Sequence, residues 1–400
     1  MNVDQLVRDT LREQAAEQPA LGPGFAERVL TVRRRRRTRT LASVAAATAA
    51  VVAVAVAVPL LDNGKHGVRL ANFVAHPDQT PPRDLIAAGD VALAAYYTWD
   101  SAKQTDGREY AVRTYRLLDQ KTGTYVKAPQ WSRVAVASGM RTAAVLERSL
   151  PARRIGLLDL RTGEVERWIP VDHGVAEIAF SPDGSKLVAT AYSKNPDLMR
   201  EKATRDINGN GDRDWLPPTS VTTSRTGFYV LNVASGKKSW SEGPVVGTFG
   251  DGYFAFSTDG KLLHLDRDYF DFAGKQVFPP ANDANVLWRD EPGVSPDGKF
   301  IGGSYMGPGF NKHASSGLYD ARTGRPPTTG RFVRGYRLLA WADDKRLIAW
   351  DVAHDSTEPV RVRHRLVLVT MGRDEVVPLS GLSELSDGGN PSWTPVLARR

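Results

Sequence analysis

The pattern of apolar and polar positions changes twice along the chain. Residues 1–40 carry apolar side chains at helical spacing, in two short pieces that Pro and Gly separate. Residues 41–61 contain no charge at all. From residue 85 to the C-terminus, short apolar runs alternate with turn-forming residues, and helical periodicity is absent. The pattern predicts a short helical tail, one long apolar helix, a linker over 62–84 and an all-β domain over 85–400.

The uncharged segment 41–61 has the length and composition of a transmembrane helix. Its 21 residues include nine Ala and six Val, and at ~1.5 Å per residue they span roughly the ~30 Å hydrocarbon core of a bilayer. Five consecutive arginines, Arg33 to Arg37, precede it and Asp62 follows it. By the positive-inside rule we expect residues 1–40 in the cytoplasm and residues 62–400 outside it, in a single-pass membrane protein.

Two features of this region leave alternatives open. A cleaved secretory signal, including the twin-arginine kind, would also show Arg followed by an Ala-rich apolar run, and the domain would then be secreted. Residues 1–40, with nine Arg against five acids, are an unstructured tail, lie with their apolar stripe on the inner leaflet, or bind a cytoplasmic partner. We do not expect nucleic-acid binding, although the chain has a net charge of +8, because a membrane-flanking role explains the arginine run.

Two turn signatures recur in the β region. The first is an apolar strand, a Ser-x-Asp-Gly turn and a second apolar strand, and Asp-Gly supplies the positive φ angles that tight hairpins need. It occurs at Ser181–Gly184, Ser257–Gly260 and Ser295–Gly298, with a fainter copy at Asp343-Asp344. The second signature is a strand that ends in an acid or amide, followed by a Thr/Ser-Gly turn. Its copies end at Gly123, Gly163, Gly236 and Gly324, and a shorter copy ends at Gly274.

Together the two signatures predict units of four antiparallel strands that repeat every 40 to 50 residues, the period of a propeller blade. Six blades are expected, and seven remain open because 62–84 could add strands. The six ranges are 85–129, 130–171, 174–244, 247–280, 285–331 and 335–380. We expect the final segment around Trp393 to join the first blade and close the ring, which removes exposed sheet edges.

The Ser-Pro-Asp-Gly hairpins at 181–184 and 295–298 and the Asp-x-x-Thr-Gly turns resemble the WD40-like (PD40) repeats of TolB-type β-propellers, over roughly residues 85–397. With the tail and the apolar segment, the layout is similar to membrane-anchored WD40-like proteins common in high-GC actinobacteria. This resemblance implies an architecture. It implies no single activity, because propellers host binding, scaffolding and catalysis alike.

The longest predicted blade contains a candidate calcium loop. Oxygen-bearing side chains recur at the spacing that Ca²⁺ requires, and Gly211 permits the sharp bend. The predicted ligands are Asp206, Asn208, Asn210, Asp214 and the backbone carbonyl of Asp212. Pro217 stands where an EF-hand has its bidentate Glu, so the pattern resembles instead the calcium loops inserted into integrin-type propellers. The alternative is a polar turn without metal, and the predicted role of the ion is structural.

No catalytic residue is predicted. The chain has no Cys, which excludes disulfides, thiolate-bound zinc and a Cys nucleophile, and its seven His are scattered without metal-ligand spacing. Neither a Gly-x-Ser-x-Gly elbow nor a phosphate-binding Gly-rich loop occurs. A hydrolase or lactonase built from distant blades stays an alternative, as does a transmembrane sensor.

Seven of the nine tryptophans recur near strand ends, where large rings usually pack between blades. We expect packing rather than a sugar- or peptide-binding surface from Trp131, Trp168, Trp240, Trp288, Trp341, Trp350 and Trp393. The sequence therefore favours a membrane-anchored propeller that binds a protein or glycan, and it does not identify that ligand.

Overall fold

The computed structural model describes most of the predicted β domain. The described residues are 73–103, 109–198, 224–243, 252–266, 268–280, 283, 286–287, 292–305, 317–323, 325, 336–354, 362–373, 376–384 and 392–400. All of them belong to Gly64–Arg400, the second of the two compact units into which the chain divides. The predicted tail, the apolar segment 41–61 and the predicted calcium loop lie outside the described residues. Within the described ranges, no helix is long and apolar enough to cross a membrane.

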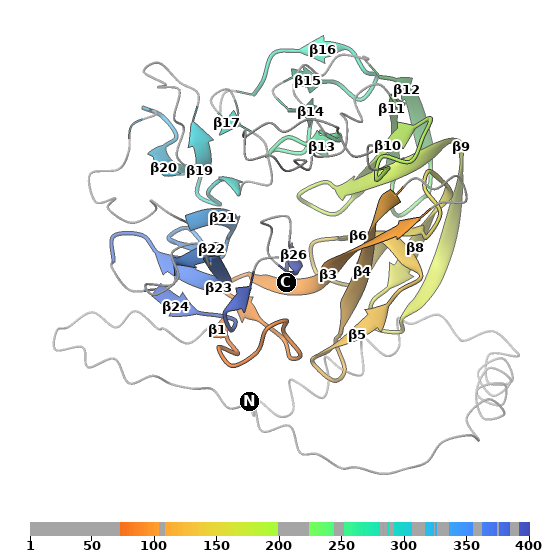
Figure 1. Cartoon of the computed structure of the whole chain (residues 1–400). Helices are drawn as coiled ribbons and strands as arrows, with labels where there is room; N and C mark the ends of the chain where they lie inside the picture. The colour runs from red at the N-terminus through yellow and green to blue at the C-terminus, as the bar shows by residue number, and fades with distance from the viewer. Residues whose placement is uncertain are drawn as a thin grey trace, which may run out of the picture. The chain divides into compact units, whose positions relative to one another are not determined.

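The described residues form five antiparallel sheets (Figure 1). The first sheet runs in the order β1-β2-β3-β4-β5, and β26 pairs with the free side of β3. Its strands are β1 (Phe73–Val74), β2 (Ala87–Ala88), β3 (Val91–Lys103), β4 (Glu109–Asp119), β5 (Thr124–Ala128) and β26 (Thr394–Arg399). Strand β26 is the last of the chain, and it lies antiparallel to β3 with Thr394 opposite Tyr97 and Arg399 opposite Val91. The prediction that the C-terminal segment joins the first sheet is confirmed.

The second sheet has seven strands in the order β12-β11-β10-β9-β8-β7-β6. They are β6 (Trp131–Val136), β7 (Thr142–Glu147), β8 (Ala152–Asp159), β9 (Glu164–Phe180), β10 (Lys186–Tyr192), β11 (Arg225–Asn232) and β12 (Lys238–Glu242). The 17-residue strand β9 pairs with β8 through 164–175 and with β10 through 175–180. The ranges predicted as separate units, 130–171 and 174–244, are therefore joined by one continuous strand.

Three smaller sheets follow in chain order. The third contains β13 (Ala255–Phe256), β14 (Leu263–Leu265), β15 (Asp268–Phe270) and β16 (Gln276–Val277). The fourth contains β17 (Val286–Leu287), β18 (Gly293–Val294), β19 (Phe300–Tyr305) and β20 (Gly317–Asp320). The fifth contains β21 (Tyr336–Trp341), β22 (Arg346–His354), β23 (Val362–Thr370), β24 (Val376–Pro378) and β25 (Ser383–Glu384).

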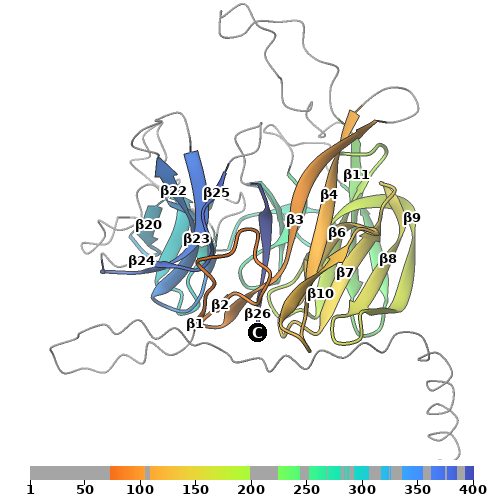
Figure 2. The same ribbon diagram turned by 60° about the horizontal axis from the view of Figure 1, so that its bottom comes forward.

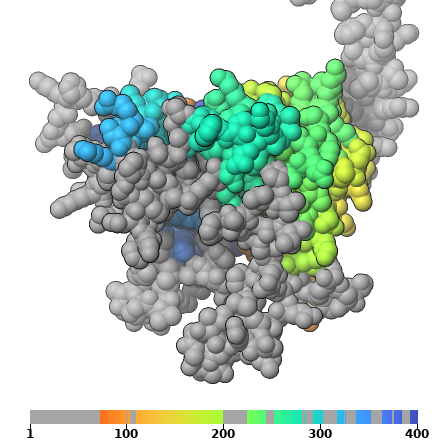
Figure 3. Space-filling model, turned by 90° about the horizontal axis from the view of Figure 1, so that it is seen from above, coloured from red at the N-terminus to blue at the C-terminus, as the bar shows by residue number. Residues whose placement is uncertain are grey.

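Hydrophobic clusters join the first sheet to the second, the second to the third and the fourth to the fifth. Tyr115 and Leu117 of the first sheet pack with Trp131 and Val134 of the second, and Leu338 of the fifth sheet packs with residues of the fourth. Side chains of β10 and β11 meet those of β13 to β15, and Figure 3 shows this contact between the green and blue-green segments. Strands held between two such clusters are buried on both faces, which explains their nearly continuous apolar runs.

A further cluster joins the last sheet to the first. Leu93 of β3 and Trp393 pack with Trp350 and Leu366 of the fifth sheet, and all four side chains are at most 3% exposed. Burying one large apolar side chain contributes roughly 1.5–3 kcal/mol. Figure 2 shows β26 and β3 between the fifth and second sheets. The described residues are thus all-β, built of antiparallel sheets, and consistent with a β-propeller-like fold.

The segment 73–84, predicted as linker, packs against this unit. Phe73 and Ala75 contact the cluster that joins the first and last sheets, and His76 forms a bridge with Ser380. The amide of Gly381 donates a hydrogen bond of 2.7 Å to the carbonyl oxygen of Gln79. The folded unit therefore begins at or before Phe73, earlier than its apolar strand pattern indicates, because 73–84 is held by backbone hydrogen bonds.

The predicted hairpin turns form as the sequence indicates. In each Ser-x-Asp-Gly copy the Ser hydroxyl donates to the Asp carboxylate, at 2.5 Å in Ser181–Asp183 and 2.7 Å in the other two copies. The following glycines have φ between 68° and 74°. These short-range contacts fix the turns locally, which is why they could be read from sequence alone.

Candidate functional site

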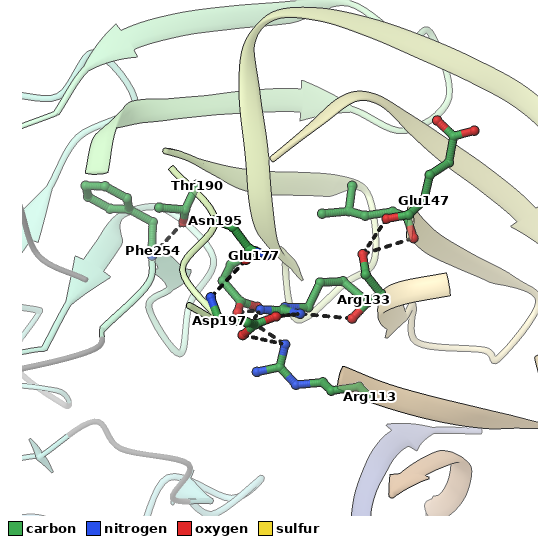
Figure 4. A network of polar contacts seen from close by, with 10 residues as sticks. Arg113, Arg133, Glu147, Glu177, Thr190, Asn195, Asp197 and Phe254 are labelled. Atoms are coloured by element: carbon green, nitrogen blue, oxygen red, sulfur yellow. Dashed lines mark hydrogen bonds and ion pairs between the residues drawn. The ribbon is translucent and has the colours of Figure 1, made fainter. Parts of the chain in front are cut away.

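A buried group of charged side chains lies where the first and second sheets meet, and Figure 4 shows it from close by. Arg113 comes from β4, Arg133 from β6, Glu177 from β9 and Asp197 from the turn after β10. We call these four residues the charged cluster. Its arginines and carboxylates are equal in number, so its formal charge is zero.

Arg133 is the centre of the charged cluster. Its side chain is 4% exposed. Its Nη1 and Nη2 donate to Oδ2 and Oδ1 of Asp197, each at 2.9 Å, and its Nε donates to Oε1 of Glu177 at 2.7 Å. Nη1 also donates to the carbonyl oxygen of Ser132 at 3.0 Å. A bidentate pair of this kind fixes geometry as well as charge, so Arg133 holds both acids in place.

Arg113 approaches the same acids from the other side. Its Nη1 lies 3.5 Å from Oδ1 of Asp197 and 3.8 Å from Oε1 of Glu177. Its guanidinium carbon lies 4.4 Å from the centroid of the Trp99 ring and 5.5 Å from that of Tyr97, both on β3. The two rings hold the guanidinium by cation–π contact.

The turn that carries Asp197 is held by local and long-range contacts. The Asn195 side-chain oxygen accepts the amide of Asp197 at 2.9 Å, as in an Asx turn. The carbonyl oxygen of Asp197 accepts the amide of Ala111 at 2.9 Å, and Tyr110 and Leu198 form a β-bridge. The β3–β4 hairpin therefore anchors the segment that follows β10.

Burial and charge act on the ionisable groups in opposite directions. Burial raises the pKa of Asp197, and the charge of Arg113 lowers it in part. Burial alone would lower the pKa of Arg113, but Glu177 and Asp197 outweigh it, so the pKa of Arg113 is raised. The neighbouring Tyr115 and Tyr192 have pKa values raised chiefly by burial. At neutral pH we therefore expect Arg113 charged and both tyrosines neutral.

A pocket opens beside the charged cluster. It is lined by Arg113, Arg148 and Asn195, by Tyr110 of β4, and by Asp197. Arg148 is exposed, and its Nη1 donates to the carbonyl oxygen of Pro129 at 2.9 Å and to that of Arg113 at 3.5 Å. Arginine and asparagine nitrogens therefore lie on the pocket wall, beside the apolar side chains of Ala111, Val112 and Leu150.

The chemistry available at this place is limited. Both carboxylates of the charged cluster accept hydrogen bonds from Arg133, whereas a general acid or base needs a carboxyl group that can exchange its proton with substrate. No histidine lines the pocket. Among the described residues, no group of three or more His, Asp or Glu side chains could hold a metal ion. The arrangement suits recognition of a charged group better than acid–base catalysis.

The predicted calcium ligands Asp206, Asn208, Asn210, Asp212 and Asp214 lie outside the described residues, so the structure does not bring them together or separate them. Of the seven tryptophans expected to pack, Trp131, Trp341, Trp350 and Trp393 are buried. Trp168 and Trp240 are partly buried against the clusters, and Trp288 lies outside the described residues.

Sequence reasoning did not single out any residue of the charged cluster. Arg133 and Asp197 are separated by 64 positions, and neither belongs to a recurring motif. One available signal was the spacing of Tyr97 and Trp99, two residues apart, which places both rings on one face of a strand.

No family model matches this chain, and no curated protein matches it in sequence. Among solved structures, it is similar to Kuenenia stuttgartiensis hydrazine synthase, with 15% identity, a TM-score of 0.35, and coverage of 66% of this chain and 69% of that one. It is also similar to TolB from Acinetobacter baumannii, with 15% identity, a TM-score of 0.31, and coverage of 74% and 67%. At these TM-scores neither likeness carries an argument about activity.

Proposed function

We propose that this protein is a membrane-anchored, six-bladed TolB-like propeller that acts outside the cytoplasm as a binding or scaffolding module. Strand β9 supports the blade count, because its two halves serve as the last strand of one four-stranded unit and the first strand of the next. Counted this way, the five sheets contain six units. The apolar segment 41–61 and its arginine flank support the anchor.

One observation favours binding over catalysis. The carboxylates of the charged cluster are occupied by arginine, while Trp99, 37% exposed, and the exposed Arg148 border the same place on the outside. An aromatic ring next to a fixed cation is a common means of recognising ligands. We call Tyr97, Trp99, Arg113 and Arg148 the binding face. Its ligand is a protein or a glycan of the cell envelope.

The competing function is hydrolysis of an envelope glycan or lactone. The raised pKa of Asp197 beside a pocket favours it, because perturbed carboxyl groups gather at catalytic sites. Full-length protein in detergent is incubated with isolated cell envelope and, separately, with chromogenic glycoside, ester and lactone substrates. Binding that Trp99→Ala weakens, without turnover, supports the binding module. Turnover that Asp197→Asn abolishes would replace it with the hydrolase.

The location is tested by cysteine labelling, since the chain has no native Cys. Lys121→Cys places a thiol in an exposed turn of the first sheet, and Gln14→Cys places one in the tail. A membrane-impermeant maleimide added to intact cells should label Lys121→Cys only, and both variants after lysis. Labelling of neither thiol in intact cells would contradict an exterior domain. Recovery of the Lys121→Cys protein in the medium would indicate that the apolar segment is a cleaved signal.

The predicted calcium loop is a separate part of the proposal. If Asp206 and Asp214 hold a structural Ca²⁺, the melting temperature of the full chain should rise with Ca²⁺ and the rise should vanish in Asp206→Ala and Asp214→Ala. A melting temperature that ignores Ca²⁺ would leave this segment as a polar turn.

A further inference from the structure

The pocket beside the charged cluster has unused donors but no unused acceptor of matching strength. Its carboxylate, Asp197, has both oxygens engaged by Arg133. The Nη1 of Arg113 is buried and makes no hydrogen bond, and its described partners are the long ion pairs with Asp197 and Glu177, at 3.5 and 3.8 Å. A ligand oxygen that reached this side of Arg113 would add the hydrogen bond that the two long ion pairs leave unmade.

Three further groups on the pocket wall can donate. The side-chain oxygen of Asn195 accepts from the backbone, which turns its amide nitrogen the other way, and no described residue accepts from that nitrogen. Arg148 uses only Nη1, toward two backbone carbonyls, and no described carboxylate lies within ion-pair distance of it. Tyr110, which also lines the pocket, carries a hydroxyl that can donate and is the third group.

The local charge is positive, so it also favours an anion. Adding Arg148 to the charged cluster gives three arginines against two carboxylates, a net charge of +1. Arg113 is held by the rings of Trp99 and Tyr97, and Arg148 is held next to it through the carbonyl oxygen of Arg113. Two guanidinium groups placed in advance lose little conformational freedom when they bind an anion.

We propose that the mouth of this pocket binds the carboxylate or phosphate group of a ligand, between Arg113 and Arg148. This inference rests on the proposed function, because the anion is the charged end of the molecule that the binding face recognises. Arg148 supplies charge and free N–H donors from the rim, and Arg113 supplies charge from the wall. Asn195 and Tyr110 donate hydrogen bonds to the remaining oxygens.

The test uses inorganic phosphate and acetate as probes of the full-length protein in detergent. Each is titrated at constant ionic strength, with chloride as the replaced ion, and binding is followed by the melting temperature and by calorimetry. A saturable response is expected for wild type with at least one probe. Phosphate alone would indicate a phosphate-bearing ligand, and both probes would indicate that any oxyanion suffices.

Two variants decide whether the response belongs to this pocket. Arg148→Gln should weaken anion affinity about tenfold or more. Arg141→Gln, which removes the same charge from an exposed position in the turn between β6 and β7, should leave it unchanged. Arg113→Lys keeps the charge but loses the planar set of guanidinium N–H donors, and should also weaken binding. No saturable response in wild type, or equal loss in Arg148→Gln and Arg141→Gln, overturns the proposal. Either result leaves the envelope-binding and labelling experiments able to succeed or fail independently.

Discussion

Arg133 donates two parallel hydrogen bonds of 2.9 Å to Asp197, a residue 64 positions later in the chain. This pair ties the first strand of the second sheet to the turn that follows β10. With Glu177 as a second acceptor, Arg133 brings three separate parts of the chain to one point.

Loss of Arg133 should therefore be costly. Arg133→Met leaves two carboxylates in a largely buried place with fewer partners, and we expect about 3–5 kcal/mol less stability to unfolding. Arg154→Met is the matched control, since Arg154 pairs with Glu147 at 2.6 Å but their side chains are 47% and 39% exposed. Solvent screens an exposed pair of this kind, so its loss should cost much less stability. Denaturant unfolding of both variants measures this difference, and equal losses would show that the charged cluster does not stabilise the fold.

Gly89 should not tolerate a side chain. It has φ of 56°, and a Cβ there would lie 2.2 Å from the carbonyl oxygen of Ala342, which directly follows β21 of the last sheet. Gly89→Ala must displace backbone at the contact between first and last sheets, so we expect a loss of more than about 3 kcal/mol. Gly123 has φ of 71° and open space around it, so Gly123→Ala should cost only about 1–2 kcal/mol. Thermal unfolding tests both, and similar melting temperatures would contradict the contact.

Acid should destabilise the fold through His264. Burial lowers the pKa of this side chain to about 4, from an ordinary value near 6.5. Between these values the unfolded chain binds the proton more readily, so stability is complete above pH 6.5 and falls as the pH drops toward 4. The full effect is about 3 kcal/mol.

The measurement is the melting temperature of wild type and His264→Phe between pH 7 and 4. Wild type should lose stability over this window, and the variant should show a flatter profile. His173→Phe, which removes an exposed imidazole, is the control and should keep the wild-type slope. An unchanged slope in His264→Phe would refute the assignment.

The Ser-x-Asp-Gly turns should contribute to the pH dependence of stability at lower pH than His264 does. Hydrogen bonds from Ser181 and Ser185 lower the pKa of Asp183 to about 2, and bonds from Lys299 and Ser295 do the same for Asp297. Their stabilisation is present above the ordinary value near 4 and is lost as the pH falls through 2. The melting temperature of Asp183→Asn/Asp297→Asn should therefore lie below wild type at pH 6 and approach it at pH 2. A difference independent of pH would contradict this.

The sequence predicted those parts of the fold that depend on neighbouring residues. Asp183-Gly184 specifies its turn through contacts two to five residues away. The segment around Trp393 could be assigned to the first sheet because the repeat pattern itself needs a closing strand. The continuity of β9 was not predicted, since nothing between Pro170 and Gly174 distinguishes a strand that changes partners from a turn. The pairing of Pro170 with Arg154 and of Val175 with Ala191 shows that no turn is present.

The charged cluster could not be predicted for a different reason. Arg133 meets Asp197 only because two sheets pack together, and a charged residue in a single sequence does not indicate its partner. The rings of Tyr97 and Trp99 were visible on one strand face, but the arginine that stacks on them, Arg113, is on the next strand.

Closure of the sheets by β26 places the first sheet, and with it the binding face, so the proposed function depends on it most. Ala398 lies opposite Ala92 across β26 and β3, and the chain has no Cys that could interfere. Ala92→Cys/Ala398→Cys in the full chain should form an intramolecular disulfide without added catalyst, and oxidation should raise the melting temperature by constraining the unfolded chain. Lys261→Cys/Ala398→Cys, with one thiol in the turn between β13 and β14 of the third sheet, should stay reduced. Free thiols or only intermolecular dimers in the first variant would contradict the closed arrangement.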